Sequence, residues 1–348
     1  MEHGNRALVF KEIGEFEKVL HLLLLPKPQI SPGHVLVRIV LRPVHQFDLV
    51  LCSDLSVAEV FFDLSKNSET PKNTGVVAGH EGGLGIVEEI GDGVTLCSPG
   101  QRVHLDITFS YFLPYFQGSW QDYILIKEES AIPVPDKIED DIAAQFSSNP
   151  WTVYGLCKEI DSPKGGYILI TAATSTVGRL FIQLAAHEGY NIIAIVRRED
   201  VKEELISLGA VAVINSALED VPKVVKQITN GEGAYLGIDL VGGTLTKSAA
   251  ASVRDGGQVM VIGELGSGDV VISQKDLWRN VEISSWNASS YFLEKEKKEA
   301  AIKACWKLFE EGIWTLPPAL KFDLSDFKQA LHETRKSARA GKVLLQTK

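Results

Sequence analysis

The chain has 348 residues, of which 45% are hydrophobic and 23% charged, an ordinary balance for a globular protein. This length predicts about two domains, because single cores stop growing well before it. The net charge of -10 argues against nucleic acid as a main partner, since such binders carry basic patches. No apolar run approaches the roughly 20 residues that cross a bilayer, so we expect no membrane partner.

The cysteines are scattered and form no CxxC pair; they are Cys52, Cys97, Cys157 and Cys305. This pattern is typical of reduced intracellular thiols, not of a disulfide framework. The start of the chain has no signal-peptide core and no Arg/Ser-rich transit character. We therefore expect a cytoplasmic protein, with a mitochondrial location open if a targeting segment is missing from this sequence.

The first part of the chain, residues 1–140, is rich in short β-branched or alternating runs separated by Gly and Pro. Such runs predict a small, mostly antiparallel barrel or sandwich. The expected strands are Ala7–Phe10, Val35–Leu41, Gly83–Ile90, Arg102–Leu105 and Gln121–Ile126.

The pattern changes near residue 140, where a helical stretch is expected from Asp140 to about Ile160. Strands and helices then alternate, which predicts βαβ units, a parallel sheet and an α/β fold of the Rossmann type over residues 141–312. The expected strands are Tyr167–Thr171, Asn191–Val196, Ala212–Ile214, Leu236–Val241, Gln258–Ile262 and Val281–Ser285. The expected helices are Val177–Glu188, Glu199–Leu208 and Leu293–Gly312.

The tail, residues 313–348, returns to strand character and is expected to fold back onto the first domain. It reads as the strand Pro318–Phe322, a helix over Leu324–Lys336 and the strand Gly341–Gln346.

One strand-turn-helix segment has the place at which a Rossmann domain binds a pyrophosphate, against free N–H groups of a helix start. Only Gly178 fills a glycine position of the usual GxGxxG pattern, so the turn alone could be an ordinary capped βα turn. The strand before it, the helix after it and the next strand favour a cofactor site. The expected contacts are Thr174, Ser175, Thr176, Val177 and Gly178.

Two arginines, Arg197 and Arg198, follow the second strand of this domain. NAD-selective domains place an acidic residue here, whereas NADP-selective ones place Arg near the 2′-phosphate. Guanidinium groups give that phosphate bidentate, charge-assisted contacts. The alternative is two solvated arginines that open a helix. The sequence therefore favours NADPH as the cofactor.

Four further motifs fall in one order along the chain. They are Gly79-His80-Glu81-Gly82 with Gly85 and Gly91 beyond it, Pro99-Gly100-Gln101-Arg102-Val103, Gly118-Ser119-Trp120-Gln121-Asp122-Tyr123 and Gly341-Lys342-Val343-Leu344-Leu345. With these motifs nearly the whole chain resembles the medium-chain dehydrogenase/reductase superfamily. The resemblance implies a GroES-like, mostly antiparallel β domain followed by a Rossmann domain.

Within that superfamily, the segment Ser148–Tyr154 is similar to the "NPxTAY" segment of 2-enoyl thioester reductases. Those enzymes use NADPH and are related to zeta-crystallin-like quinone reductases. The resemblance implies that Asn149 and Thr152 lie beside the nicotinamide. It implies further cofactor contacts from Leu240, Val241, Gly263, Trp286 and Lys342.

The chain departs from these relatives around the proton donor. Their "NPSD" motif reads His45-Gln46-Phe47-Asp48 here, and no Tyr follows between Leu49 and Lys72. Candidate polar groups in its place are His45, Asp48 and Asn149, although Asp48 could instead make a structural bond to a turn. Tyr111 and Tyr115, in an aromatic loop, are further candidates to line the site.

The zinc ligands of the superfamily's alcohol dehydrogenases are also altered. His80 matches the histidine ligand, but His45 and Ser148 stand where the two thiolates would be, and Ser is a poor zinc ligand. The structural lobe's clustered cysteines are absent, because Cys97 stands alone. We expect no metal. An atypical site from both histidines with Glu81 or Asp48 remains open, as does a buried hydrogen-bonded pair of His80 and Glu81.

These observations predict a metal-free reductase that transfers hydride from NADPH to an activated C=C bond (2-enoyl thioester, enal or enone) or to a quinone. Its partner is a small electrophilic substrate. The alternatives are a zinc-dependent alcohol dehydrogenase with atypical ligands and a non-catalytic NADPH-binding protein. A homodimer could form through an edge strand of the Rossmann sheet, at Gly266–Ile272 or Val281–Ser285.

Overall fold

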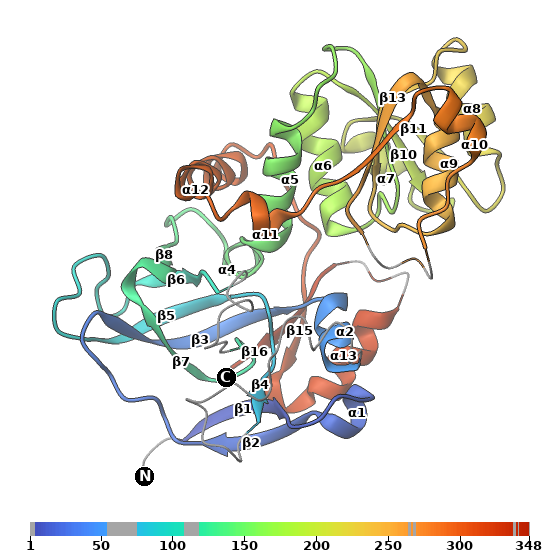
Figure 1. Ribbon diagram of the computed structural model, residues 1–348. Helices are drawn as coiled ribbons and strands as arrows, with labels where there is room; N and C mark the ends of the chain where they lie inside the picture. Colours follow the sequence, from blue (N-terminus) through green and yellow to red (C-terminus); the bar gives the residue numbers. More distant parts are fainter. Residues whose placement is uncertain are drawn as a thin grey trace. The chain divides into compact units, whose positions relative to one another are not determined.

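A computed structural model describes residues 4–53, 75–107, 118–263, 266, 269–336, 339 and 341–347. The chain divides into two compact units (Figure 1). Unit 1 is Met1–Ser148 with Pro317–Lys348, and unit 2 is Asn149–Leu316. The domain boundaries expected after residues 140 and 312 stay predictions.

Unit 1 holds two sheets, in which antiparallel pairing dominates. The smaller sheet has the order β2-β1-β4, with β1 at Asn5–Phe10, β2 at His21–Leu25 and β4 at Val76–Val77. The larger has the order β15-β16-β3-β5-β6-β8, and β7 also pairs with β3. Its strands are β3 (His34–Val44), β5 (Leu84–Ile90), β6 (Arg102–Leu105), β7 (Tyr123–Lys127), β8 (Ala131–Pro133), β15 (Leu320–Asp323) and β16 (Val343–Gln346).

The alternation of β3 explains one core of unit 1. Val35, Val37 and Ile39 point to one face and are fully buried in a cluster with residues of β5, β6 and β7. A second cluster packs β1 and β16 against helical segments around the buried Trp120. The helices of unit 1 are α1 (Phe16–Val19), α2 (Gln46–Ser53), α4 (Asp140–Ala143) and α13 (Phe327–Arg335), with the 3₁₀ turns η2 (Glu128–Ser130) and η3 (Leu324–Asp326).

Unit 2 is built on a six-stranded parallel sheet with the order β11-β10-β9-β12-β13-β14. The strands are β9 (Tyr167–Ile170), β10 (Asn191–Val196), β11 (Ala210–Asn215), β12 (Ala234–Asp239), β13 (Val253–Val261) and β14 (Glu282–Ser285). This is the Rossmann strand order, in which the chain reverses direction across the sheet between β9 and β12. Ligands bind such sheets at the carboxyl ends of the strands beside that switch point.

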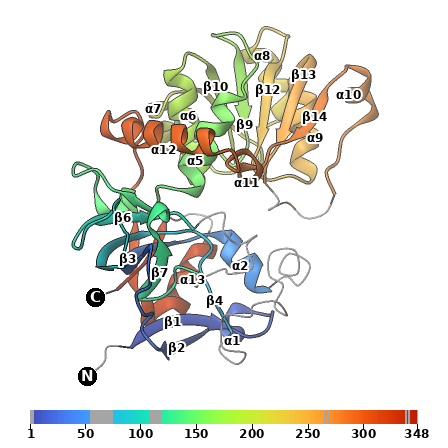
Figure 2. The same ribbon diagram turned by 60° about the vertical axis from the view of Figure 1, so that its left-hand side comes forward.

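Helices cover both faces of this sheet (Figure 2). On one face, α8 and α9 pack on Leu169, Ile193 and Val259. Ile168 and Ile192 point to the other face and are also fully buried, which fits strands made of continuous apolar runs. The helices are α5 (Ser148–Lys158), α6 (Thr176–His187), α7 (Lys202–Ser207), α8 (Val221–Ile228), α9 (Thr244–Ser252), α10 (Gln274–Trp278), α11 (Ala288–Tyr291) and α12 (Lys295–Glu310).

The structure confirms the α/β class with an antiparallel unit and a parallel one, but it corrects several elements. The helical stretch expected from Asp140 to Ile160 is two helices, α4 and α5, and Ser148 at the junction has a left-handed φ of 28°. Helix α13 begins after a 3₁₀ turn, at Phe327 instead of Leu324. The sequence reading also missed β2, α2, α8 and α9. Short elements of this kind depend on tertiary packing more than on local preference.

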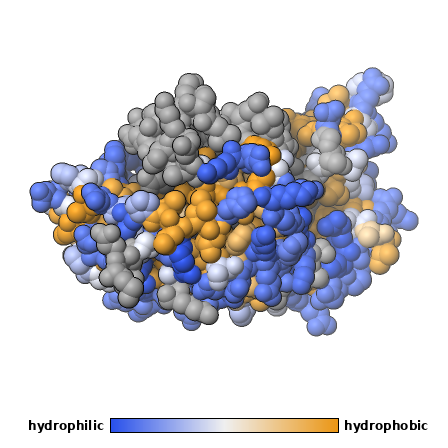
Figure 3. All heavy atoms as spheres, turned by 90° about the horizontal axis from the view of Figure 1, so that it is seen from below, coloured by the Kyte–Doolittle hydropathy of each residue, from blue (hydrophilic) through white to orange (hydrophobic). Residues whose placement is uncertain are grey.

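The apolar run near the N-terminus forms β2, an edge strand that pairs with β1 alone among the described strands. Leu24 on this strand is 72% exposed, and Leu22, Leu23 and Leu25 are half-buried. Apolar surface is visible on the face shown in Figure 3. Within the described residues, no helix combines the length and apolar character that a membrane span requires.

Candidate active site

The turn between β9 and α6 forms the first part of the candidate site. Ser175 is the N-cap of α6, and its hydroxyl accepts a hydrogen bond of 3.0 Å from the amide of Gly178. The carbonyl of Ser175 accepts the amide of Arg179. The first amides of a helix have no partner inside it. The amides of Thr176 and Val177, which follow the cap, are therefore suited to a phosphate group.

The backbone of this turn is tightly constrained. Ala172 has a φ of 45°, a left-handed value that is uncommon for residues with a side chain. The amide of Ala173 donates to the carbonyl of Ile195, which ties the turn directly to the end of β10. A Cβ on Gly178 would lie 2.6 Å from the carbonyl oxygen of Ala173, so only glycine fits there. The turn is thus held against the sheet and shaped for a close ligand.

The two arginines after β10 differ in their surroundings. Arg198 forms an ion pair of 3.3 Å with Asp200. Arg197 is exposed and makes no ion pair with the residues that the structure describes. Because β9 and β10 are parallel neighbours, Arg197 emerges at the same edge of the sheet as the α6 turn. The residues present therefore fit a phosphorylated dinucleotide, with Arg197 as the freer cation.

A buried carboxylate organises the next strand end. Asp239, at the end of β12, is fully buried and accepts hydrogen bonds from the hydroxyls of Thr171 and Thr246 at 2.8 and 2.7 Å. It also accepts the amides of Val241 and Gly242, while Thr171 accepts the amide of Leu240. The sequence reading missed Asp239 and Thr171 as site-forming residues. An acidic residue closing an otherwise apolar strand was the available signal.

The expected contacts Leu240, Val241 and Gly263 lie close together in the loops that follow β12 and β13. A Cβ on Gly263 would lie 1.8 Å from the carbonyl oxygen of Leu240 and 2.7 Å from the amide of Val241. The loops after β12 and β13 therefore approach each other at backbone distance. The structure places these three residues together at the carboxyl edge of the sheet, beside the switch point.

Helix α5 carries two more of the expected residues. Asn149 and Thr152 are three positions apart, so they lie on the same face of α5. Asn149 is buried and Thr152 is half-buried. Trp286 packs its ring edge against Gly155 of this helix, since a Cβ there would lie 2.6 Å from the indole. The ring centroids of Trp286 and Tyr291 are 5.4 Å apart. These contacts of Trp286 pack side chains within unit 2.

Unit 1 contains a separate cluster of ionisable side chains around His45. The Lys342 Nζ lies 2.8 Å from His45 Nδ1 and donates to it. On the other side of the ring, His45 Nε2 contacts the Glu81 carboxylate. Lys342, His45 and Glu81 are 6%, 9% and 1% exposed, so the whole row is buried. Lys342 was expected only as a cofactor contact, and its link to His45 could not be read from the sequence.

Asp48 holds the two histidines of this cluster in place. Its Oδ2 accepts the amide of His45 at 2.8 Å. Its Oδ1 accepts the amide and the Nδ1 proton of His80 at 2.9 and 2.8 Å. The sequence left two roles open for Asp48, a polar group of the site or a structural bond to a turn. Its bonds to the amides of His45 and His80 are of the structural kind. These partners differ from the expected pair of His80 and Glu81: His80 bonds to Asp48, and Glu81 contacts His45.

Burial shifts the proton affinities within the cluster. Desolvation raises the pKa of Glu81 to about 7, although Lys342 and His80 oppose this. Desolvation lowers the pKa of Lys342 to about 8, partly offset by the charges of Glu81 and Asp48. Burial, with Lys342 nearby, moves the pKa of His45 well below its usual value. The imidazole is thus neutral, with an ammonium on one side and a carboxyl group on the other.

The same cluster holds the residues of the alternative zinc site. In the described part of the chain, no group of three or more His, Cys, Asp and Glu side chains is arranged to hold a metal ion. Both nitrogens of His45 are engaged, by Lys342 and by Glu81. A lysine ammonium against an imidazole nitrogen competes with a cation for that lone pair. The donor set therefore fits zinc poorly.

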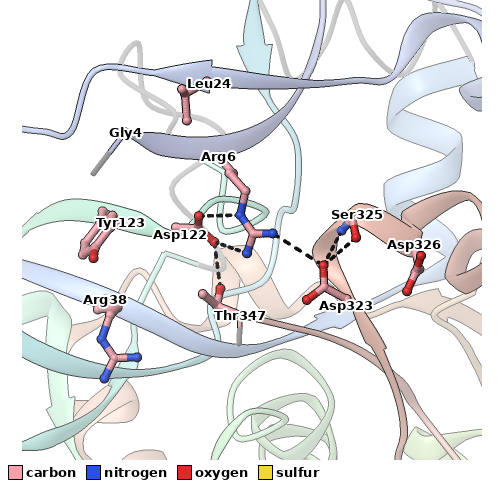
Figure 4. A pocket seen from close by; sticks show the side chains of 10 residues that line it. All are labelled: Gly4, Arg6, Leu24, Arg38, Asp122, Tyr123, Asp323, Ser325, Asp326 and Thr347. Carbon is pink, nitrogen blue, oxygen red and sulfur yellow. Dashed lines mark hydrogen bonds and ion pairs between the residues drawn. The ribbon is translucent and has the colours of Figure 1, made fainter. Parts of the chain in front are cut away.

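Unit 1 also has an open pocket of about 660 Å³ (Figure 4). Arg6 lies across it and bonds to Asp122 at 2.8 Å and to Asp323 at 3.5 Å. The Thr347 hydroxyl donates to Asp122 at 2.9 Å. These contacts join β1, β15 and the C-terminal end, with one guanidinium between two carboxylates. No predicted site residue lines this pocket.

Several expectations fall outside the described residues. Tyr111 and Tyr115 of the aromatic loop lie there. Residues 54–74 lie there too, and they include most of the segment from Leu49 to Lys72, in which the sequence has no Tyr.

Two family models match the chain. Residues 31–136 match the alcohol dehydrogenase GroES-like domain, and residues 176–305 match the zinc-binding dehydrogenase model. Together these ranges cover more than half of the chain.

Curated and solved proteins agree with these matches. The mitochondrial enoyl-acyl-carrier-protein reductase of Schizosaccharomyces pombe is 32% identical over 271 residues, covering 74% of this chain and 70% of its own. The Homo sapiens protein of that name is 27% identical over 98% of this chain and 88% of its own. A crystal structure named as an NADPH:quinone reductase from Bacillus thuringiensis has a TM-score of 0.85 and 26% identity, and covers 99% of both chains.

Proposed function

The chain belongs to the medium-chain dehydrogenase/reductase superfamily of oxidoreductases, and from this premise we propose that it is an NADPH-dependent, metal-free reductase of activated C=C bonds. The proposal rests on the arrangement of residues at the carboxyl ends of the strands in the unit 2 sheet. There the capped α6 turn and the free Arg197 fit a dinucleotide with a 2′-phosphate. A quinone is the second acceptor class, favoured by the likeness to a structure named as a quinone reductase.

Each part of this edge has its own task. The amides after Ser175 bind the pyrophosphate, and Arg197 binds the 2′-phosphate. The Asp239–Thr171 bond fixes the loop that carries Leu240 and Val241. NADPH, when bound, supplies the hydride.

Helix α5 supplies the polar groups that we propose for the nicotinamide side. Asn149 and Thr152 share one face of α5 and orient the ring and the acceptor carbonyl. Negative charge that develops on that carbonyl oxygen requires a hydrogen-bond donor. In the proposed reaction Thr152 is therefore more important for turnover than for cofactor affinity.

The metal-free character is supported by the contacts of the His45 cluster. Lys342 and Glu81 occupy both nitrogens of the imidazole, and Asp48 is engaged by His80. The competing zinc-dependent alcohol dehydrogenase would require this row to rearrange around a cation.

The test is a substrate panel with purified protein, followed by the loss of NADPH absorbance. The panel contains 2-enoyl thioesters, enals, enones, quinones and, in the oxidative direction, simple alcohols. Turnover of the unsaturated acceptors, unaffected by chelator and without stoichiometric zinc in elemental analysis, is expected. Alcohol oxidation that depends on bound zinc would overturn the proposal. Tight NADPH binding without any turnover would favour the non-catalytic alternative.

We also propose a homodimer through β14. Of the two expected segments, only the second forms a strand, β14 at Glu282–Ser285, which lies at one edge of the sheet; the described part of Gly266–Ile272 forms no strand. The segment before β14 exposes Val270, Leu277 and Trp278, the last at 75%. Apolar groups beside an unpaired strand edge favour pairing with a second copy.

The location is a separate proposal. The curated relatives carry mitochondrial names, so both a cytoplasmic and a mitochondrial location are to be tested by fractionation of cells that express the tagged protein.

A further inference from the structure

Arg179 is a nearly buried cation in the first turn of α6, and this position is costly. It is the fourth residue of the helix, and only 8% of it is exposed. The helix dipole places positive potential at this end, so a cation here is unfavourable unless other groups compensate for it. Burying a guanidinium is costly as well unless it is paired. The contacts of Arg179 therefore call for an explanation.

A carboxylate of α7 pairs with this guanidinium. Arg179 Nε lies 2.6 Å from Glu204 Oε1, and Nη2 lies 3.1 Å from Glu204 Oε2. This bidentate, charge-assisted geometry fixes the plane of the guanidinium as well as its position. The remaining nitrogen, Nη1, donates to the carbonyl oxygen of Thr174 in the α6 turn. Glu204 thus holds Arg179 against the turn to which the pyrophosphate site is assigned above.

The contact with Thr174 restrains one peptide group of this turn. The carbonyl of Thr174 and the amide of Ser175 belong to the same planar peptide. Arg179 holds its carbonyl end, while its amide end donates to the Ala172 carbonyl at 2.9 Å. Both ends of the peptide are therefore fixed. The main-chain amide of Arg179 adds a further restraint, because it donates to the Ser175 carbonyl at 2.9 Å.

The orientation of this peptide matters for an anion. A carbonyl oxygen carries partial negative charge, so a Thr174 carbonyl turned toward a phosphate would repel it, whereas amide protons attract it. Because the guanidinium binds that carbonyl, the peptide is held in one orientation. The amides of Thr176 and Val177 then remain the groups that the start of α6 offers to a ligand.

We propose that Arg179 is a positioning residue for the cofactor: its guanidinium, anchored by Glu204, holds the Thr174 carbonyl so that the α6 turn keeps the shape that binds a pyrophosphate. This inference rests on the proposed function, and all of its residues lie in unit 2. Its role differs from that of Arg197, which is assigned to the 2′-phosphate. NADPH and NADH share the pyrophosphate, so Arg179 should matter equally for both.

The first experiment measures the affinity of the full-length protein for three ligands by calorimetric titration. NADPH has both kinds of phosphate, NADH has the pyrophosphate alone, and adenosine 2′-phosphate has the 2′-phosphate alone. Arg179→Met removes the guanidinium and keeps a long unbranched side chain. It should weaken NADPH and NADH by the same factor, about tenfold or more, and leave adenosine 2′-phosphate unchanged. Arg179→Lys keeps the charge without the planar fork, so it should recover only part of the affinity.

A second variant separates positioning from direct contact with the phosphate. The Glu204 side chain is 39% exposed, so Glu204→Ala should fold. If Arg179 acts through the turn, loss of its anchor should weaken both nucleotides. If the guanidinium itself bound the pyrophosphate, removal of the competing carboxylate would tighten both. Tighter binding in Glu204→Ala would therefore overturn the inference.

Arg279 provides the matched control within unit 2. It is half-buried, pairs with Asp255 and Asp276, and donates to the Val253 carbonyl. Val253 begins β13, so these contacts lie at the amino ends of the parallel strands, opposite the α6 turn. Arg279→Met should therefore lose comparable bonds and keep wild-type affinity for both nucleotides.

A further measurement needs no nucleotide. Hydrogen exchange followed by mass spectrometry reports how firmly residues 172–178 are held. Exchange in this segment should be faster in Arg179→Met and Glu204→Ala than in wild type, and unchanged in Arg279→Met. Wild-type affinity for NADH in Arg179→Met, or unchanged exchange of the turn, would overturn the inference and leave the proposed function standing. A wild-type protein that binds neither nucleotide would overturn both.

Discussion

The hydroxyl of Thr171 donates a hydrogen bond of 2.8 Å to Oδ1 of the buried Asp239, across the carboxyl ends of the neighbouring strands β9 and β12. The same hydroxyl oxygen accepts the amide of Leu240 at 2.9 Å. One side chain thus bonds to both the strand-end carboxylate and the loop that follows it. This is the position in the sheet at which a Rossmann domain binds its cofactor.

Replacing that hydroxyl tests its importance. Thr171→Val removes a donor to Asp239 and an acceptor for Leu240 while keeping the shape of the side chain. We expect the free energy of unfolding to fall by about 1–3 kcal/mol, because buried partners are left unsatisfied. NADPH affinity should fall as well. Urea unfolding and calorimetric titration measure the two effects. Thr171→Ser keeps the hydroxyl and should retain most of the stability and most of the NADPH affinity. Equal losses of these two quantities in the Ser and Val variants would contradict this prediction.

Cofactor selectivity should depend mainly on Arg197. Arg197→Ala should weaken NADPH about tenfold or more, since a charge-assisted contact to the 2′-phosphate is worth roughly 1.5–3 kcal/mol. NADH, which lacks that phosphate, should be almost unaffected. Arg198→Ala is the matched comparison and should do less, because Arg198 already pairs with Asp200. Fluorescence titration with both nucleotides measures this, and equal weakening of NADH would refute the assignment.

Thr152 should matter for turnover more than for binding. Thr152→Ala removes a hydroxyl from the face of α5 that also carries Asn149. We expect kcat to fall by about tenfold, with NADPH affinity within a few-fold of wild type, since one hydrogen bond to a developing charge is lost. Thr152→Ser should restore most of kcat. Unchanged turnover in the alanine variant would remove Thr152 from the proposed site.

His104 should make the fold sensitive to acid. Burial lowers its pKa to about 4, although a bond from Nδ1 to the Ala143 carbonyl favours the charged form. Between about pH 6.5 and this value, the unfolded chain holds a proton that the folded one lacks. Stability should therefore fall as the pH drops through this window, by up to about 3 kcal/mol from this group.

The matched variant for this effect is His104→Asn, whose amide can keep the bond to Ala143 but does not titrate. Urea unfolding at several pH values should show a smaller loss of stability in the variant than in wild type. The same pH dependence in both proteins would show that other groups are responsible.

The proposed dimer depends on the apolar surface next to β14. Trp278→Asp places a charge on a side chain that is 75% exposed, so it should not disturb the fold of a monomer. We expect the variant to be monomeric in light scattering at concentrations at which wild type is dimeric. The control is Leu293, an apolar side chain elsewhere that is 83% exposed, and Leu293→Asp should leave the dimer intact. A wild-type monomer, or a dimer in both variants, would contradict the proposal.

Much of the unit 2 edge was predictable because its signals are local. The apolar strand over Tyr167–Ile170, the capped turn at Ser175 and the arginines after β10 are contiguous along the chain. Helices α8 and α9 were missed because short amphipathic segments gain their stability from packing on the sheet. The junction at Ser148 was missed because its left-handed φ has no marker such as glycine.

The sequence by itself determined the α/β class, the strands of unit 2 in chain order and the residues of the α6 turn, because hydrophobic periodicity and turn chemistry act between near neighbours. Only the tertiary structure decided that Thr171 meets Asp239, and that His45 lies between Lys342 and Glu81. Those partners are far apart in sequence and meet only through strand pairing. Their proton affinities follow from burial, which the fold alone creates.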